Sequence, residues 1–514
     1  MFSRFYQPVL FFLLAIRYAA AACISSGDET TINNALSAGG SGTIVQLCPS
    51  TVILINNVIS FTADSQEIST QGYPNDDTRA IIRIASGNTV GTLIQGAFNS
   101  NVRLLNVQID GDRPNNGIQS GAGANIELGG GSTGVVVSHV ASRNPRGWSC
   151  MHLSESGNTA SPCTNVTATY NDIGPCGQEG TDVAGNGQWA DGISFACTNS
   201  LVSQNTITGS TDGGIVLFNA PGTKVTSNTI TSSTTDSGFG AINLVDYISE
   251  YGGSFAGVQI SNNVITGQKL FNTGIAIGGC AWSFGQCNPT LSGPVTITDN
   301  TFSGHIGFSI GINGWTDGLT ISGNSVSGVT TPTSSFAEDI NCDSGLQSLF
   351  SQNTQLIYYP AGLTGPTNLQ SNFIAASSNA TNFICTSNLL PTSVIFPLSS
   401  TLNMGTVAQL HNNILLSYQG DNNLVVYNTS TPGGYTPEWA SGYSESDCGS
   451  GECVIDFQGD GNLVNYFNGN AVWNTRTAGV GAQSLEFVNQ EPWLQILDGD
   501  GNALWSTIDG VYAG

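Results

Sequence analysis

The sequence predicts an all-β protein whose larger part is a right-handed parallel β-helix. Only 9% of the residues are charged and 65 are glycine, a composition typical of many short strands joined by tight turns. A short phrase also recurs: Asn, a small residue, an aliphatic or aromatic residue, then Ser, Thr or Gly. It begins at Asn171, Asn205, Asn228, Asn263, Asn300 and Asn324, with weaker copies at Asn106 and His139. The uneven spacing indicates solenoid coils with loop insertions and argues against a propeller, whose blades have near-constant length.

Each phrase is followed by a turn and a short strand with a period of two. Two ladders of apolar residues are expected to stack inside the coils. One contains Ile126, Met151, Ile193, Ile215, Ile242, Ile275 and Ile310, and the other Leu128, Leu153, Phe195, Leu217, Leu244, Ile277 and Ile312. Asparagine suits the corner between two sheets, because it tolerates the left-handed region and can bond to its copies above and below. The β-helix is expected to have three sheets per coil and to occupy residues 23–400.

The first 22 residues are interpreted as a secretory signal peptide. Arg4 precedes the apolar run 9–16, and Ala19 to Ala22 offer small residues for cleavage. The apolar run is too short to cross a bilayer, so an exported, extracellular protein with no membrane partner is expected.

Twelve cysteines in an exported chain are interpreted as disulfides. Proximity along the chain suggests the pairs Cys23–Cys48, Cys163–Cys176, Cys280–Cys287, Cys342–Cys385 and Cys448–Cys453, which leaves Cys150 and Cys197. Glycosylation sequons at Asn165, Asn379 and Asn428 fit secretion by a eukaryote.

The net charge of the chain limits the classes of partner that it can bind. A net charge of −24 argues against nucleic acid and fits neutral glycans better than uronates. The four histidines are scattered, and no zinc spacing or phosphate loop is present. No metal site or cofactor is expected, although Ca²⁺ stays open.

The strands at 191–195 and 213–217 carry a resemblance. Trp189 to Ser194, followed by Thr211 to Val216, resembles the pectate-lyase superfamily of secreted β-helix proteins, in particular a secreted fungal group. The resemblance covers about residues 23–345 and implies the fold more than a reaction.

Outward residues of successive strands should form a row with one residue per coil. It contains Glu127, His152, Ser194, Val216, Asn243, Ala276 and Gly311. Asp191 and Asp212 open two successive strands at one edge, and Asp246 follows the Asn243 strand. Trp189 and Trp282 lie in insertions that could wall a groove for sugar rings. The substrate-groove candidates are therefore Trp189, Asn243, Arg146 and Trp282.

Two carboxylates one coil apart are the parts of a glycoside hydrolase, with one protonated and the other ionised. Asp191 and Asp212 are the first candidates for this pair, and Glu127, Asp246 and His152 the next. The alternative is that both aspartates only form turns, because Asp-Gly is a favoured turn pair. The spacing is also similar to polygalacturonases, but Gly213 replaces the second Asp of their pair and Phe239 replaces their His. A lyase would need cations, for which Arg143 and Arg146 are candidates, so hydrolysis is favoured.

Residues 401–514 form a second domain with a different repeat. The motif Gln419, Asp421, Asn423, Val425 and Tyr427 returns as Gln458, Asp460, Asn462, Val464 and Tyr466. Side chains at alternate positions of a strand face one way, so each set can surround a hexose. The motif is similar to that of bulb-type, mannose-binding lectins, which implies a β-prism with core tryptophans at 439, 473 and 505. In the third repeat the five places are expected at Val488, Gln490, Pro492, Leu494 and Ile496, which would bind no sugar.

The sequence thus predicts a secreted protein that binds mannose-containing glycans of polysaccharides or glycoproteins and hydrolyses a polysaccharide in the β-helix. The alternatives are a non-catalytic lectin on a β-helix scaffold and a polysaccharide lyase.

Overall fold

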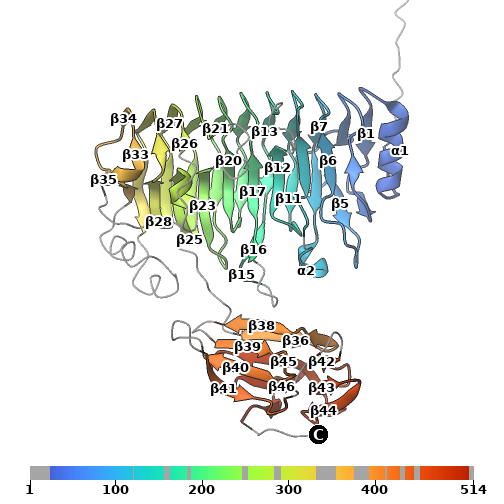
Figure 1. The fold of residues 1–514 in the computed structure, drawn as a ribbon. Coiled ribbons are helices and arrows are strands. Elements are labelled where there is room, and N and C mark those ends of the chain that lie inside the picture. Colours follow the sequence, from blue (N-terminus) through green and yellow to red (C-terminus); the bar gives the residue numbers. More distant parts are fainter. Residues whose placement is uncertain are drawn as a thin grey trace, which may run out of the picture.

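The computed structural model shows an all-β chain with a parallel β-helix followed by a prism of three antiparallel sheets (Figure 1). It describes residues 23–119, 121–154, 162–181, 187–245, 253–282, 291–330, 355–375, 393–410, 414–428, 435–444, 448 and 452–508. The predicted signal peptide and the predicted pair Cys342–Cys385 lie outside these residues, as does Cys287 of the pair Cys280–Cys287. The predicted fold class is confirmed.

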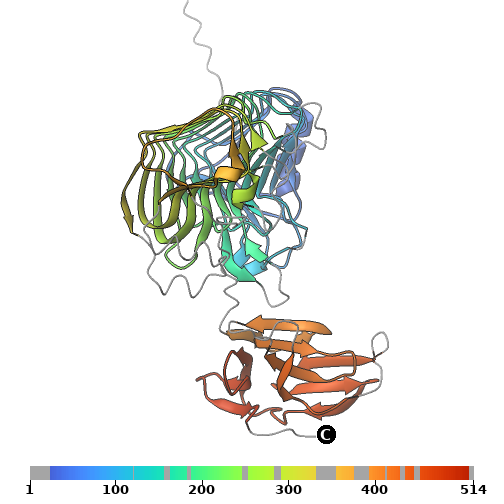
Figure 2. The ribbon, with the colours of Figure 1, turned by 60° about the vertical axis from the view of Figure 1, so that its left-hand side comes forward.

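Three tracks of parallel strands build the coils, as expected (Figure 2). The first contains β1 (Ile44–Leu47), β4 (Glu67–Thr70), β7 (Arg103–Leu105), β10 (Val136–Ser138), β13 (Thr167–Thr169), β18 (Leu201–Ser203), β21 (Lys224–Thr226), β24 (Gln259–Ser261), β27 (Val295–Thr298), β30 (Leu319–Ser322) and β34 (Thr367–Asn368). The second, called the site track below, contains β3 (Ile59–Ser60), β6 (Ile94–Ala97), β9 (Ile126–Gly129), β12 (Ser149–Ser154), β17 (Asp191–Phe195), β20 (Gly213–Phe218), β23 (Gly238–Val245), β32 (Leu356–Tyr358) and β35 (Ile374–Ala375).

The third track contains β2 (Val52–Ile55), β5 (Ala80–Ile84), β8 (Val107–Asp110), β11 (Ala141–Arg143), β14 (Asp172–Ile173), β19 (Thr206–Thr208), β22 (Thr229–Thr231) and β31 (Ser325–Thr330). The long strands β25 (Val264–Ile277) and β28 (Thr301–Ile312) run through the site track and the third track and join them. Shorter elements are the hairpin β15 (Gly177–Thr181) with β16 (Gly187–Trp189), the strands β26 (Leu291–Ser292), β29 (Trp315–Thr316) and β33 (Leu363–Thr364), the helices α2 (Arg113–Asn116) and α3 (Gly279–Trp282), and the 3₁₀ turn η1 (Pro360–Gly362).

The interior of the coils contains the two predicted ladders. Strand register places Met151, Ile193 and Ile215 opposite one another, and Leu153, Phe195 and Leu217 likewise. Every member of both ladders is 0% exposed. Because each stacked side chain removes apolar surface from water, burying one is worth roughly 1.5–3 kcal/mol. The predicted ladders are confirmed.

The recurring asparagines form a continuous hydrogen-bonded ladder. In each step, the backbone N–H and Nδ2 of one asparagine donate to Oδ1 of the asparagine on the next coil, at 2.9–3.1 Å. The ladder runs through Asn171, Asn205, Asn228, Asn263, Asn300 and Asn324. Each Nδ2 also donates to a backbone carbonyl of the first track, for example that of Val202. The predicted bonding to copies above and below is confirmed.

The left-handed backbone at this corner belongs to the residue before each ladder asparagine, not to the asparagine itself. Positive φ angles occur at Tyr170, Gln204 and Ser227, and also at Asn106 and His139. The two weaker copies of the phrase therefore occupy the corner position and not the ladder position. Val140 takes the ladder position in the His139 coil, and its N–H donates to Oδ1 of Asn171.

Helix α1 (Glu29–Gly39) closes the N-terminal end of the β-helix (Figure 1). Asp28 caps it, because Oδ1 of Asp28 accepts the N–H groups of Thr30 and Thr31. Ile32 and Leu36 are fully buried against the first coils. The helix thus covers the apolar end of the stack, which would otherwise face water.

The described disulfides confirm two predicted pairs and correct a third. Cys23–Cys48 and Cys448–Cys453 are bonded as expected. The predicted pair Cys163–Cys176 is wrong, because Cys150 bonds Cys176 and Cys163 bonds Cys197. These two bonds connect neighbouring coils, and proximity along the chain does not measure proximity between coils.

The C-terminal prism has three four-stranded antiparallel sheets around one core. One sheet contains β36 (Ser393–Pro397), β45 (Ala482–Val488), β46 (Leu494–Asp498) and β47 (Ala503–Ser506). Another contains β37 (Ser400–Leu402), β42 (Cys453–Phe457), β43 (Leu463–Phe467) and β44 (Asn470–Asn474). The third contains β38 (Gly405–Leu410), β39 (Ile414–Tyr418), β40 (Leu424–Asn428) and β41 (Thr436–Ala440).

The prism begins before the expected boundary at residue 401. Strand β36 pairs with β45, and its residues Val394 and Phe396 are buried in the prism core. The expected bounds placed this stretch in the β-helix. Its alternation of buried and exposed residues is nevertheless that of a half-buried strand.

Candidate functional site

The predicted row on the site track exists, but most of it is buried. Register aligns Glu127 with His152, then Ser194, Val216, Asn243, Ala276 and Gly311. Ser194 and Asn243 are 0% exposed, and Val216 forms a small apolar cluster with Ala196, Phe218 and Val245. The outward face of this track is therefore not a flat, exposed sheet.

Asp191 opens β17 and is almost completely buried. Its Oδ1 accepts the N–H of Gly213 at 2.9 Å, and its Oδ2 lies 2.7 Å from Oγ of Ser194. Ser194 Oγ is also 3.0 Å from Oγ of Ser149, whose own proton is directed to the carbonyl of Met151. One hydroxyl proton on Ser194 cannot serve both neighbours. Ser194 Oγ therefore donates to Asp191 or to Ser149, one at a time.

Asp212 lies on the next coil, just before β20, and is half-buried. Register pairs Asp191 with Gly213, so Asp212 stands one residue before the aligned position. Burial raises the pKa of Asp212 to about 7. Burial, and then the charge of Asp212, raise the pKa of Asp191 well above its ordinary value, against smaller opposing effects of the bonds from Ser194 and Gly213. The two predicted carboxyl groups therefore interact and titrate as a coupled pair.

The other predicted catalytic residues lie farther along the track. Oε1 of Glu127 accepts the N–H of Ala124 at 2.8 Å and the hydroxyl of Thr92 at 3.1 Å, which ties it to its own turn. His152 is 9% exposed, and its ring packs edge-on against Trp148 with centroids 4.6 Å apart. Asp246 lies outside the described residues.

The predicted groove residues have different environments. Trp189 ends β16 and packs on Phe239, with ring centroids 5.2 Å apart. Asn243 lies in β23 on the aligned row. Trp282 ends α3, and its side chain lies outside the described part of the structure.

Arg146 is a structural residue, which corrects its assignment to the groove. It is 4% exposed, and its guanidinium donates to the carbonyls of Gly117, Asn88, Val90 and Asn116. These bonds hold together loops from three coils. Burial also lowers the pKa of Arg146. A guanidinium with these bonds is not available to a substrate.

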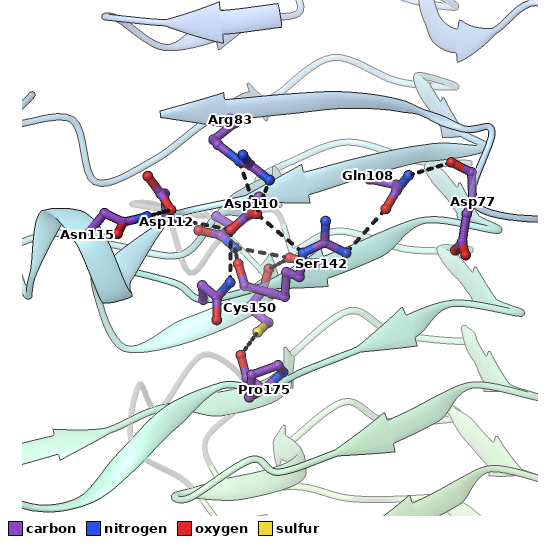
Figure 3. A network of polar contacts seen from close by, with 12 residues as sticks. Asp77, Arg83, Gln108, Asp110, Asp112, Asn115, Ser142, Cys150 and Pro175 are labelled. Atoms are coloured by element: carbon purple, nitrogen blue, oxygen red, sulfur yellow. Dashed lines mark hydrogen bonds and ion pairs between the residues drawn. The ribbon is translucent and has the colours of Figure 1, made fainter. Parts of the chain in front are cut away.

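Arg143, the other cation of the lyase alternative, belongs to an ion-pair network on the third track. Oδ2 of Asp110 contacts Arg83 at 3.0 Å and Arg143 at 3.3 Å (Figure 3 labels Arg83 and Asp110). Oδ1 of Asp110 accepts from Asn144 at 3.0 Å. Burial raises the pKa of Asp110, but the bonds from Asn144 and from the Asp112 N–H, together with the two arginines, bring it below its ordinary value. The arginines here neutralise Asp110.

A pocket of about 500 Å³ lies beside the β15–β16 hairpin and α2. Its polar lining includes Arg113, Gln178, Gln188 and Asp236. Neither Asp191 nor Asp212 lines it. The pocket includes Gln188, the neighbour of Trp189 in the chain. No sequence pattern predicts this pocket, because its lining comes from loops of several coils.

In the first of the two prism motifs, side chains of the predicted set bond to one another and to the backbone. Nε2 of Gln419 donates to the hydroxyl of Tyr427 at 2.8 Å. Oδ1 of Asp421 accepts the N–H of Asn423 at 3.2 Å, and Oδ1 of Asn423 accepts from Ser441 at 2.9 Å.

The second motif repeats these contacts. Nε2 of Gln458 donates to the hydroxyl of Tyr466 at 2.6 Å, and Oδ1 of Asp460 accepts the N–H of Asn462 at 3.0 Å. Oδ1 of Asn462 accepts from Thr475 at 3.1 Å. In both motifs the valine, Val425 or Val464, is buried beneath the polar groups. Among the described residues, Oδ2 of each aspartate has no hydrogen-bond partner.

The third repeat departs from the motif, but one residue away from the predicted places. Strand pairing makes Gln495 the equivalent of Val425 and Val464. Each of the three is the second residue of its strand and pairs with the preceding strand of its sheet, at Glu486, Ser417 and Asp456 respectively. Gln495 donates to Glu486 at 2.9 Å. Leu494 and Ile496 are 0% exposed and face the core. The extra residue in the turn before β46 explains the wrong register.

The three tryptophans form the centre of the prism, as predicted. Rings of Trp439, Trp473 and Trp505 pack edge to face in a closed triangle, with centroids 6.1–6.2 Å apart. Because one tryptophan comes from each sheet, this contact fixes the three sheets around one axis.

One family model and several solved structures are similar to parts of this chain. Residues 150–326 match the family model described as "Right handed beta helix region". Among solved structures, an alginate lyase from Paenibacillus sp. str. FPU-7 is 13% identical, with a TM-score of 0.42, covering 67% of this chain and 99% of that one. The pectate lyase Pel9A is 14% identical, with a TM-score of 0.38, covering 67% and 84%. The Polygonatum cyrtonema lectin complexed with monomannoside is 28% identical, with a TM-score of 0.17, covering 24% and 100%. No curated protein matched.

No described helix is both long and apolar enough to cross a membrane. No cluster of three or more His, Cys, Asp and Glu side chains in the described ranges could hold a metal ion.

Proposed function

We propose that the protein is a secreted glycan-binding protein whose prism binds mannose-type sugars through two sites. The observation that carries this proposal is the repetition of one polar arrangement in two motifs of separate sheets. In each motif the Gln–Tyr bond fixes the tyrosine hydroxyl, and the aspartate keeps one oxygen available to accept from a sugar hydroxyl. The described disulfides support secretion.

Binding to immobilised mannose tests this proposal. We expect the double variant Asp421→Ala, Asp460→Ala to lose retention, because unpaired sugar hydroxyls cost roughly 1–3 kcal/mol at each site. Each single variant should bind more weakly than the wild type, because the loss of one site removes the gain in affinity that two linked sites provide. Glu491→Ala is the matched control, since Glu491 occupies the aspartate place of the third repeat. Retention of the double variant at wild-type strength would contradict the proposal.

We further propose that the β-helix hydrolyses a polysaccharide with Asp191 and Asp212 as the catalytic pair. Burial raises the pKa of both groups, so one of the pair can stay protonated. We assign the more deeply buried Asp191 as the general acid and Asp212 as the group that acts on water or the sugar. The general acid protonates the oxygen of the leaving sugar, which then departs as the glycosidic bond breaks. The engagement of Arg143 and Arg146 elsewhere weighs against the lyase alternative.

A panel of neutral and acidic polysaccharides tests catalysis. Hydrolysis releases new reducing ends, whereas a lyase releases unsaturated products that absorb in the ultraviolet. Asp191→Asn and Asp212→Asn should each lower the rate by two or more orders of magnitude, because positioned proton transfer contributes about 10²–10⁴. Cleavage of no polymer by the wild-type protein would favour the non-catalytic lectin on a β-helix scaffold.

A further inference from the structure

The pocket of about 500 Å³ beside α2 and the β15–β16 hairpin, both labelled in Figure 1, is open to solvent. Neither carboxyl group of the proposed catalytic pair lines it, so it is a separate site. Arg113 lines the pocket and is only 8% exposed, so the cavity reaches a buried charged side chain. Four other lining residues are exposed, namely Pro114, Pro175, Gln178 and Thr235. A small ligand can therefore enter this pocket from solvent.

Hydrogen bonds connect the walls of this pocket to one another. Nη2 of Arg113, on α2, donates to the carbonyl of Gln188, on β16, at 2.8 Å. On the other strand of the hairpin, the N–H of Glu179 donates to Oδ1 of Asp236 at 3.1 Å. Oε2 of Glu179 in turn accepts the N–H of Ser237 at 2.9 Å. The hairpin is thus fixed both to α2 and to residues 236–237, so the pocket is preformed and binding requires little reordering of its walls.

Three amide side chains line the pocket and keep polar atoms available to a ligand. Nδ2 of Asn144 donates to Asp110 at 3.0 Å, whereas its Oδ1 accepts no hydrogen bond from a described residue. Oε1 of Gln188 lies 3.4 Å from Nη2 of Arg113, and its Nε2 donates to no described residue. The amide of Gln178 is exposed and bonds no side chain or backbone group in the described ranges. The lining therefore offers both donors and acceptors to a ligand that carries hydroxyl groups.

The charge and the apolar part of the lining indicate the class of ligand. Arg113 and Asp236 are the charged lining residues, and their formal charges cancel. An anion would meet Asp236 and the negative field of a chain with a net charge of −24, and a cation would meet Arg113. Apolar surface comes from Pro114, Ile118 and Pro175. A neutral sugar, with hydroxyl groups at its edge and C–H groups on its faces, matches this lining, and the volume lies within the range of about 300–1,000 Å³ typical of small-molecule sites.

We propose that this pocket is a further glycan-binding site, which takes a neutral sugar unit of about disaccharide size. Oδ1 of Asn144 accepts from a sugar hydroxyl, Nε2 of Gln188 donates to a sugar oxygen, and the exposed amide of Gln178 completes the contact. The apolar side chains of the lining contact the C–H face of the ring. The site depends neither on hydrolysis by the carboxyl pair nor on mannose binding by the prism.

Isothermal titration calorimetry on the full chain tests this site. The chain carries Asp421→Ala and Asp460→Ala, so that the two motifs of the prism do not contribute to binding. Mannobiose, cellobiose, laminaribiose and diacetylchitobiose are the neutral probes, and digalacturonate is the acidic probe. We expect at least one neutral probe to bind. Digalacturonate should bind at least about tenfold more weakly, because its carboxylates would meet Asp236 and an acidic chain.

Variants of the two hairpin glutamines place the ligand in the pocket. Gln178→Ala and Gln188→Ala should each weaken neutral binding about three- to tenfold, because each removes a hydrogen bond to the sugar. Their melting temperatures should match that of the parent chain, because the backbone bonds of the hairpin stay in place. Gln95→Ala is the matched control, since Gln95 is an exposed glutamine of β6 that does not line the pocket, and it should bind unchanged.

Three results would overturn the pocket as a glycan site. The first is that no neutral probe binds, and the second is that digalacturonate binds as tightly as the best neutral probe. The third is that neutral binding persists unchanged in both glutamine variants. If that persistent binding were lost in Asp191→Asn, the sugar would lie at the carboxyl pair and not in the pocket.

Discussion

The coupled carboxyl pair should make the protein less stable as the pH rises, and Asp212→Asn should remove much of that loss. The folded-state pKa of Asp212 is about 7, against an ordinary value of 3.8. Between these values the folded protein retains a proton that the unfolded chain has released. The stability that this proton contributes is complete below about pH 4 and is lost as the pH rises through about 7.

The magnitude follows from the size of the shift. A difference of about three pKa units, at about 1.4 kcal/mol each, sets a ceiling of about 4 kcal/mol. Asp212 is half-buried, so water near its carboxyl reduces this figure, and we expect about 2–4 kcal/mol. Asparagine has a similar shape and does not ionise. Asp212→Asn should therefore match the wild type near pH 4 and exceed its stability by this amount at pH 8.

Denaturant unfolding followed by circular dichroism at pH 4, 6 and 8 measures the effect. The difference between the variant and the wild type reports the charge of Asp212 together with its effect on the neighbouring Asp191, since all other carboxylates are shared. Asp500→Asn, which removes an exposed carboxylate, is the control and should not change the pH dependence. Parallel stability curves for Asp212→Asn and the wild type, or a less stable variant at pH 8, would refute the reasoning.

Three other predictions concern the fold. Ile215→Asp should prevent secretion of folded protein, because an unpaired charge in the inner ladder costs several kcal/mol, and a secreted, folded variant would mean that this face is misassigned. Asn228→Ala should lower the free energy of unfolding by about 2–5 kcal/mol, because it strands the Asn205 amide and the Val202 carbonyl, whereas the exposed control Thr229→Ala should change little. Arg146→Lys should destabilise the protein without changing carbohydrate binding, because an ammonium cannot replace the planar fork that holds four carbonyls.

Much of the fold could be predicted because the coils repeat. The apolar ladders and the asparagine spacing are local patterns, and stacking gives each of them one position per coil. The pair Asp191 and Asp212 was predictable for the same reason, since both precede strands that align. Contacts between coils have no such local signal. Arg146 reaches carbonyls of residues 88 and 90, and the Cys163–Cys197 bond skips a nearer cysteine in the chain.

The third prism repeat shows a different limit. A single additional residue in the turn before β46 shifted the predicted alignment, and each such shift exchanges core and surface positions on a strand. The sequence motif could not reveal this shift, because the third repeat lacks the motif residues that would fix its alignment with the other two. The burial of Asn243 could not be predicted from the sequence either, since it depends on how neighbouring coils pack over its side chain.

The asparagine ladder also has a direction. Every amide donates toward the next coil and accepts from the previous one, so the amide dipoles align along the helix axis and polarise one another. Such a chain needs an acceptor at its last donor. Gln370 supplies it, since its Oε1 accepts both the N–H and Nδ2 of Asn324, and its Nε2 returns a bond to the Asn324 carbonyl. The segment around Gln370 is therefore the terminus of an aligned series of dipoles, and shortening the β-helix at this end would require a new residue to finish it.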